Sequence, residues 1–159
     1  MSSRIRVAWG TGAAPTEMAA YDAALADANL HNYNLVGVSS VIPADAGVDA
    51  VGTAPDLGPA GNKLTVVEAH ANTAGPGHTS AALAWAERGD DPGLFYEAAG
   101  ETSDDDVESR VTAGIEAGLD LRGWDADDPA VRSVTVEAEP GEHAAAVVVA
   151  AYGDSDPVC

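Results

Sequence analysis

The chain has 159 residues, the length of one ordinary domain, and its 26 Asp and Glu against 7 Lys and Arg give a formal net charge of -19. This charge argues against nucleic acid as a partner, because phosphate binding needs clustered Lys and Arg. No run approaches the roughly 20 apolar residues of a membrane-spanning helix, and the N-terminus lacks the apolar core of a secretory signal, so we expect a cytoplasmic protein without membrane contact.

The N-terminal part of the chain predicts a strand, a helix, a second strand and a long loop. Residues 4–9 alternate apolar and polar side chains as a strand does, and a Gly-Thr-Gly run follows as a breaker. Residues 16–30 are Ala-rich, with larger apolar side chains at helical spacing, and indicate a helix. Residues 34–42 are rich in β-forming side chains, whereas residues 43–62 are dense in Ala, Gly, Asp and Pro and indicate an irregular segment.

The rest of the chain predicts two more helices and four more strands. Ser103 should be the N-cap of a helix over residues 103–119, with three acidic residues in its first turn and apolar residues at every fourth position. The last strand has no polar face and should be central in its sheet. The other helix is expected at residues 79–88, and the strands at residues 63–71, 93–99, 132–138 and 144–152, the last two paired through a Pro140-Gly141 turn. Together these elements predict one mixed α/β domain over residues 1–159.

Two serines, Ser39 and Ser40, interrupt the apolar strand predicted at residues 34–42. The period of two places Ser40 on one face with Val38 and Ile42, where a hydroxyl is costly unless it is paired or used. Taken alone, the pair is better explained by hydrogen bonds to nearby backbone than by a reactive hydroxyl, because Ser-Ser is a common dipeptide.

Four blocks of sequence resemble the pyruvoyl-dependent arginine decarboxylase family. Residues 34–43, Asn-Leu-Val-Gly-Val-Ser-Ser-Val-Ile-Pro, are similar to the self-cleavage segment of that family. The other three blocks are Tyr21-Asp22-Ala23-Ala24-Leu25, Gly93-Leu94-Phe95-Tyr96-Glu97 and Leu121-Arg122-Gly123-Trp124. They occur in the order that the family has, and together the four blocks span most of residues 18–125.

The resemblance implies a fold and a maturation step. The fold is a four-layer αββα sandwich, assembled as a homotrimer or a dimer of trimers with active sites between subunits. The chain would cut itself between Ser39 and Ser40 into a β chain, residues 1–39, and an α chain, residues 40–159. By the same resemblance, the Ser40 hydroxyl would attack the Ser39 carbonyl, and elimination of the resulting ester would leave a covalent pyruvoyl group derived from Ser40. No separate cofactor is therefore expected. A strained backbone at the end of the strand would favour the attack.

The resemblance also implies an activity, the decarboxylation of L-arginine to agmatine and CO2 in polyamine biosynthesis. Glu97 would then be the proton donor after CO2 leaves, and Asp22 would bind the guanidinium of arginine through paired charge-assisted bonds. Leu25 lies on the same helical stripe as Asp22 and would contact the substrate. Asn34 would position the substrate or the cleaving peptide.

Each of these residues also has a plain structural explanation. Glu97 could be an exposed strand carboxylate, Asp22 a solvated acid on an Ala-rich helix, and Asn34 a turn residue. Two other functions stay open, namely a pyruvoyl decarboxylase of another amino acid and a non-processing, non-enzymatic relative that acts in assembly. The chain departs from the family pattern at Tyr33, over residues 44–62 and beside Glu97, which leaves the amino acid substrate open.

Other chemistries find little support. The four His show no pair at the helical spacing of metal ligands, and Cys159 is the only cysteine, so neither a metal site nor an internal disulfide is expected. The Gly-Thr-Gly run lacks the rest of a nucleotide-binding motif, and Ser40 lies in no Gly-x-Ser-x-Gly turn of a hydrolase. The three acidic residues at 104–106 lack the alternating spacing of a calcium loop.

The acidic composition also indicates a solvent. Lys63 is the only lysine, and the apolar residues are mostly Ala and Val. A dense carboxylate surface stays hydrated in concentrated salt, where the Debye length at about 1 M falls to roughly 3 Å and self-repulsion is screened. We therefore expect a halophilic source, the alternative being an acidic interaction protein.

Overall fold

Two β-sheets and two helices make up the structure, a computed structural model that describes residues 3–159. The first sheet has the strand order β2-β5-β9-β1-β4 and the second has the order β3-β7-β6-β8. The mixed α/β class predicted from the sequence is confirmed. In chain order the elements are β1 (Ser3–Ala14), α1 (Glu17–Asp27), β2 (Asn34–Gly37), β3 (Val41–Ile42), β4 (Ala46–Gly52), β5 (Lys63–Ala74), β6 (Gly77–Arg88), β7 (Asp91–Gly100), α2 (Asp104–Arg122), β8 (Ala130–Ala138) and β9 (His143–Tyr152).

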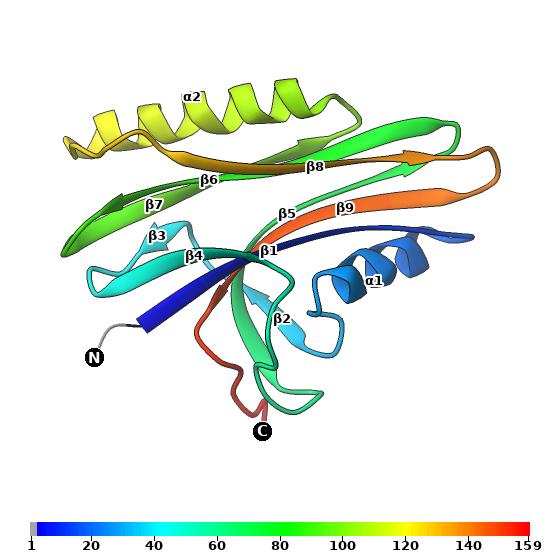
Figure 1. The fold of residues 1–159 in the computed structure, drawn as a ribbon, viewed down its shortest axis with the longest axis horizontal. Coiled ribbons are helices and arrows are strands. Elements are labelled where there is room, and N and C mark those ends of the chain that lie inside the picture. Colours follow the sequence, from blue (N-terminus) through cyan, green and yellow to red (C-terminus); the bar gives the residue numbers. More distant parts are fainter. Residues whose placement is uncertain (1–2) are drawn as a thin grey trace.

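Each helix covers a different sheet (Figure 1). α2 lies along the strands β6, β7 and β8, whereas α1 lies against β1 and β9 of the other sheet. Buried side chains form three clusters, one between α1 and the first sheet, one between the two sheets and one between the second sheet and α2. Since both sheets contribute to the middle cluster, they pack face to face, with Val148 and Phe95 among its members.

Both helices begin at residues that accept a hydrogen bond from the first turn. Ser103 caps α2 by accepting from the Asp106 N–H at 3.2 Å, as predicted, and Gly123 ends the helix with a φ of 65°. Thr16 caps α1 in the same way by accepting from the Ala19 N–H. The predicted apolar face of α2 is confirmed, because four residues spaced by four are buried against the second sheet, Val107, Val111, Ile115 and Leu119.

The helix predicted at residues 79–88 is wrong, because this segment forms β6 at the centre of the second sheet. Its alternate residues face different layers. Leu83 and Trp85 pack between the sheets, whereas Ala82 and Ala84 lie under α2. The helix propensity of alanine was outweighed because a small side chain on this face lets α2 approach the sheet closely.

The first strand runs beyond its predicted end at Trp9 and through the two glycines, whose composition predicts a break. A Cβ atom at Gly10 would collide with the Ala24 carbonyl oxygen, and one at Gly12 would collide with the backbone of Ala23 and Ala24. These glycines therefore let α1 pack directly on β1, and they do not end the strand.

Two further predictions for residues 34–62 are corrected. The strand expected at residues 34–42 is split, because β2 pairs with β5 in the first sheet and β3 pairs with β7 in the second. The segment expected to be a long loop contains β4, which runs parallel to β1 as an edge strand. The strands β2, β3 and β4 are short edge strands that depend on pairing with longer neighbours, which local sequence does not reveal.

The last two strands do not pair with each other as predicted. β8 pairs with β6 in the second sheet, whereas β9 pairs with β1 and β5 in the first. The turn at Gly141 therefore carries the chain from one sheet to the other. The central place predicted for β9 is confirmed, since it is the third of five strands and buried along most of its length.

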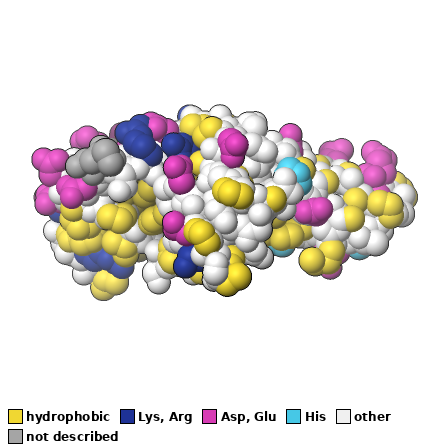
Figure 2. Space-filling model, turned by 90° about the horizontal axis from the view of Figure 1, so that it is seen from below, with side chains coloured by type: hydrophobic (Ala, Val, Ile, Leu, Met, Phe, Trp, Pro, Cys, Tyr) yellow, Lys and Arg dark blue, Asp and Glu magenta, His cyan; other side chains and the backbone are white. Residues whose placement is uncertain are grey.

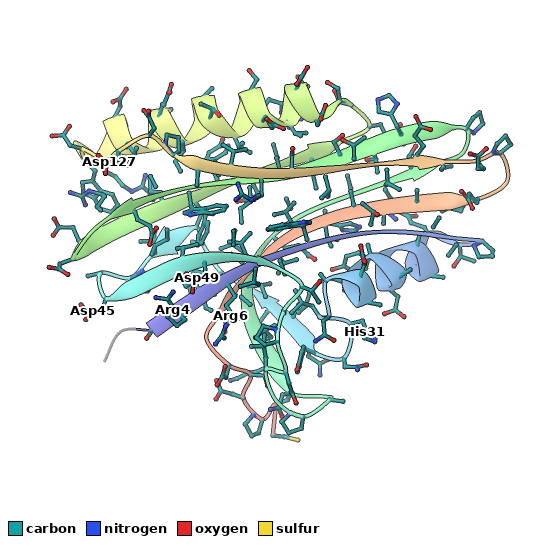
Figure 3. All side chains as sticks on the ribbon, viewed as in Figure 1. Arg4, Arg6, His31, Asp45, Asp49 and Asp127 are labelled. Carbon is teal, nitrogen blue, oxygen red and sulfur yellow. The ribbon has the colours of Figure 1, made fainter. Side chains whose placement is uncertain are left out.

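Acidic side chains are spread over the surface. Figure 2 shows them across the face seen from below, with few Lys and Arg among them. Three ion pairs occur within residues 3–159, and Figure 3 shows one of them, Arg4 with Asp49, where β1 and β4 run side by side. No helix of that part of the chain is long and apolar enough to cross a membrane.

Candidate active site

The serine pair lies where the chain crosses from one sheet to the other. The Val38 N–H still donates to the Val66 carbonyl of β5 at 3.0 Å, and Val41 already pairs with Leu94 of β7. Ser39 and Ser40 form the connection between these two pairings. The alternation that placed Ser40 on a strand face with Val38 is therefore wrong, because no continuous strand passes through the serines.

Ser40 contacts Glu97. Its Oγ donates a hydrogen bond to Glu97 Oε2 at 3.1 Å, although the two residues are 57 positions apart in sequence. Glu97 lies on β7 two residues after Phe95, which packs between the sheets, so both side chains leave the strand on the same face. The structure thus brings together two of the residues singled out in the sequence.

A cavity of about 530 Å³ opens at this contact. Ser39, Ser40 and Glu97 line it together with apolar and aromatic residues of β7 and with residues of α2, most of them small or apolar and one of them Arg122. Glu97 and Ser39 are exposed in the isolated chain, and Ser40 is partly exposed. The cavity therefore offers a hydroxyl and a carboxylate to a molecule entering from solvent.

The backbone at the crossing forms a tight turn without a left-handed residue. The Val41 N–H donates to the Ser39 carbonyl at 2.9 Å, and the Phe95 N–H donates to the Ser40 carbonyl at 2.8 Å. Among residues 3–159 the non-glycine residue with a positive φ is Asn29, after α1. The backbone strain expected at the serines is therefore not present as a left-handed conformation of either residue.

Tyr152, which the sequence analysis did not single out, also reaches the crossing. Its hydroxyl donates to the Val41 carbonyl at 2.9 Å. Burial raises the pKa of Tyr152 to about 12, and the negative charge of Glu97 adds to this effect. One signal in the sequence could have pointed to Tyr152, namely its place at the end of an apolar run. A Tyr hydroxyl in such a place usually has a hydrogen-bond partner.

The three residues predicted to bind substrate line a different cavity. Asp22 and Leu25 of α1 and Asn34 at the start of β2 surround an open volume of about 620 Å³. Asp22 is exposed, whereas Leu25 is buried in the cluster beneath α1. The Asn34 amide donates to the Gly61 carbonyl at 2.9 Å, so it also has the structural role that its turn position suggested.

Tyr33, a departure from the family pattern, has a role in this second cavity. It lines the wall, its hydroxyl donates to the Gly58 carbonyl at 2.9 Å, and the Leu57 N–H donates to the same hydroxyl at 3.1 Å. Tyr33 thereby holds the segment between β4 and β5 against the cavity.

The two cavities have no lining residue in common within one chain. The first holds the serine pair and Glu97, and the second holds Asp22, Leu25 and Asn34. Within residues 3–159, no group of three or more His, Cys, Asp or Glu side chains is placed to hold a metal ion.

Comparisons with known proteins agree with the resemblance seen in the sequence. A family model described as pyruvoyl-dependent arginine decarboxylase matches residues 4–157. A protein of that name from Halobacterium salinarum is 74% identical over 98% of this chain and 97% of its own length, which fits the halophilic source expected from the composition. Relatives of the same name from Pyrococcus horikoshii and Methanopyrus kandleri are 37% and 34% identical over 86% and 89% of this chain and 88% and 89% of their own lengths. The chain therefore belongs to the pyruvoyl-dependent arginine decarboxylase family.

Proposed function

We propose that this chain converts L-arginine to agmatine and CO2, a step of polyamine biosynthesis, with a covalent pyruvoyl group made from Ser40. The observation that carries the proposal is the hydrogen bond of 3.1 Å between Ser40 Oγ and Glu97 in a cavity open to a substrate. The family match over residues 4–157 supports the reaction, and the contact supports these two residues as its centre.

Self-cleavage starts at the peptide between Ser39 and Ser40. Ser40 Oγ attacks the carbonyl carbon of Ser39, the C–N bond of that peptide breaks, and the hydroxyl proton passes to the freed nitrogen, which leaves an ester. Loss of the Cα proton of Ser40 with cleavage of its Cβ–Oγ bond then releases residues 1–39. Water then adds to the Cα of residue 40, the nitrogen of that residue leaves as ammonia, and a ketone remains at residue 40.

The surroundings of residue 40 fit a pyruvoyl group. The carbonyl of Ser40 is held by the Phe95 N–H at 2.8 Å, and the side chain opens into the cavity beside Glu97. The pyruvoyl group supplies a ketone for the substrate amine and a neighbouring carbonyl that takes up the electrons released with CO2. Glu97 is placed to hold the proton that replaces CO2 on the substrate carbon.

Asp22, Leu25 and Asn34 are proposed to bind the rest of the substrate. The Asp22 carboxylate accepts from the guanidinium, for which a planar, two-pronged pairing is favourable. Leu25 contacts the aliphatic stem. Asn34 is held by its amide nitrogen to Gly61, which leaves its carbonyl oxygen to accept a hydrogen bond.

We infer that neighbouring subunits share the active site in a homotrimer or a dimer of trimers. Arginine must meet residue 40 with its amine and Asp22 with its guanidinium, yet these residues line separate cavities within one chain. Exposed apolar side chains lie beside both cavities, Met18 near Asp22 and Val41, Tyr96 and Leu121 near the serine pair. Burial of these side chains would also exclude water from Glu97.

We further propose that the layers are those of the αββα sandwich of the family. The three buried clusters support this order, because each one lies between two successive layers. In that arrangement the crossing at Ser39 and Ser40 connects the two inner layers.

Intact mass measurement of protein folded in concentrated salt tests the proposal. The wild-type chain should give two fragments, residues 1–39 and residues 40–159, the second blocked at its N-terminus, and Ser40→Ala should stay intact. Ser109→Ala, an exposed serine on α2, is the matched control and should cleave. A wild-type chain that folds and stays uncut would identify a non-processing relative and overturn the proposal.

CO2 release from a panel of amino acids tests the substrate. Arginine should be decarboxylated well above the others, because the Asp22 carboxylate, which lines the second cavity, is proposed to pair with a guanidinium. A cleaved protein that prefers another amino acid would keep the pyruvoyl chemistry and contradict arginine as the substrate.

A further inference from the structure

Four groups around the scissile peptide are fixed by hydrogen bonds in the uncut chain. Ser40 Oγ donates to Glu97, and the Ser40 carbonyl accepts from the Phe95 N–H. The Val41 N–H donates to the Ser39 carbonyl at 2.9 Å, and the Val41 carbonyl accepts from the Tyr152 hydroxyl at 2.9 Å. A bond from residue i to residue i+2 defines a tight three-residue turn, which here centres on Ser40.

The pairing of β3 explains why Val41 needs partners outside its own sheet. β3 is an edge strand of two residues, and it pairs antiparallel with β7. Because Ser40 is hydrogen-bonded to Phe95, the N–H and C=O of the next residue, Val41, point away from β7. The turn takes the N–H, and Tyr152 takes the C=O.

Tyr152 comes to this turn from the other sheet. It is the last residue of β9, and its ring packs against Phe95 with the centroids 6.0 Å apart. The packed ring fixes the position of the hydroxyl, which is protonated and able to donate at neutral pH, as a phenol ordinarily is. Tyr152 thus ties a two-residue edge strand of one sheet to the central strand of the other.

The direction of the Val41 N–H matters for the attack on the Ser39 carbonyl. When Ser40 Oγ bonds to that carbon, the carbonyl oxygen takes up negative charge until the C–N bond breaks. A fixed N–H that already points at this oxygen stabilises the charge without reorganisation, as in an oxyanion hole. The Val41 N–H is such a donor, at 2.9 Å.

We propose that Tyr152 is a positioning residue for self-cleavage, which holds the Val41 carbonyl so that the Val41 N–H stays directed at the Ser39 carbonyl oxygen. The inference rests on the proposed function, since it concerns the same cleavage. It assigns to β9, which lies outside the serine segment, a part in activating the chain.

The test measures the rate of cleavage and not the activity of the mature enzyme. Full-length precursor is purified unfolded in denaturant and low salt, folding is started by dilution into concentrated salt, and the fragment of residues 40–159 is followed by intact mass. Tyr152→Phe should keep the ring packing and slow cleavage by about three- to tenfold, the factor that one neutral hydrogen bond supports. Tyr21→Phe is the matched control, because it removes a hydroxyl that donates to Glu68 on the outer side of the first sheet.

A second variant removes the donor itself. Val41→Pro lacks the N–H, which the pairing with β7 does not use, and should slow cleavage by about 100-fold or more, as loss of an oxyanion donor does. Adding Tyr152→Phe to Val41→Pro should cause no further slowing, because both changes act through the same N–H. Independent, multiplicative effects would contradict the proposed route through Val41.

Hydroxylamine separates the steps, because it cuts an ester but not a peptide under mild conditions. In Tyr152→Phe the slow step is ester formation, so hydroxylamine should not raise the rate of chain cleavage. Restoration to the wild-type rate would show that the ester forms normally and would overturn the proposal, as would a Tyr152→Phe rate equal to wild type at equal folded fraction by circular dichroism. A wild-type chain that folds and never cleaves would instead overturn the proposed function.

Discussion

At the residue scale, the site depends on a few polar contacts held by an apolar frame. Ser40 and Glu97 meet because β3 pairs with β7, and the hydroxyl of Tyr152 meets Val41 because β9 lies opposite in the other sheet. The resemblance predicted Ser40 and Glu97, since both lie in short blocks that local sequence can match. Tyr152 has no such block, and its role depends only on which strand lies across from it.

Replacing Asp22 by Asn tests the proposed guanidinium contact. The amide keeps the shape and loses the charge, so the KM for arginine should rise by about 10- to 100-fold, the range for a hydrogen bond to a charged group. The rate at saturating arginine should change much less, because Asp22 is proposed to bind the end of the substrate that does not react. Steady-state kinetics of the cleaved protein in concentrated salt measure both constants.

The matched control removes the same charge elsewhere. Asp105→Asn lies in the exposed first turn of α2, outside both cavities, and should leave KM unchanged. Equal KM values for wild type and Asp22→Asn would contradict the proposed contact between Asp22 and the guanidinium. An equal rise in KM for Asp22→Asn and Asp105→Asn would indicate an effect of net charge.

At the element scale, close packing decided between helix and strand. The Ala-rich segment of β6 has the composition of a helix, but it lies between β7 and β8 with α2 on one side and the first sheet on the other. In the same way, the glycines inside β1 have the composition of a turn, but the structure shows that α1 packs directly on them. Small residues thus mark the places where a second layer comes near, which a pattern of propensities does not distinguish from a turn.

Gly10→Ala tests this explanation for β1. The added methyl would meet the carbonyl oxygen of Ala24, so α1 must shift from the sheet, and the free energy of unfolding should fall by about 1–3 kcal/mol, the usual cost of overpacking. Denaturant unfolding of the Ser40→Ala background in concentrated salt measures the loss without interference from cleavage.

Gly100→Ala provides the comparison within β7. No atom lies within 4 Å of an added Cβ there, so the free energy of unfolding should stay close to that of the background. If both variants behaved alike, the close approach of α1 would not explain the glycine at position 10.

At the scale of the whole molecule, charge and assembly act together. The net charge is -19, and three ion pairs occur within residues 3–159, one of which joins Asp106 to Arg110 on the exposed side of α2. Exposed ion pairs add little stability, so the solvent must screen most of the repulsion. The subunit sharing that we propose brings further acidic chains together and increases the need for salt.

Stability should therefore rise with ionic strength. The Debye length falls from about 10 Å at 0.1 M to about 3 Å at 1 M, so the midpoint of thermal unfolding should rise steeply across that range. Sodium and potassium chloride at equal ionic strength should act alike, because screening does not depend on the identity of the ion. A midpoint independent of salt would contradict screening as the basis of the acidic surface.

The sequence by itself determined the α/β class, both helices that the structure contains, the N-cap of the second of them, the central place of the last strand and the family. These features rest on local patterns, such as Ser103 before an acidic turn or a run of β-forming residues without a polar face. It also singled out Ser40 and Glu97, because their motifs are contiguous in the chain.

Only the tertiary structure decided which strands share a sheet, and with it the geometry of the site. Pairing joins residues far apart in sequence, so β8 and β9 separate into different sheets and the serines lie at a crossing between sheets. The placement of Asp22 in a cavity distinct from that of Ser40 follows from the same topology. The physical reason is that a strand is stabilised by burial against neighbours on both faces. The sequence of the strand itself does not specify which elements those neighbours are.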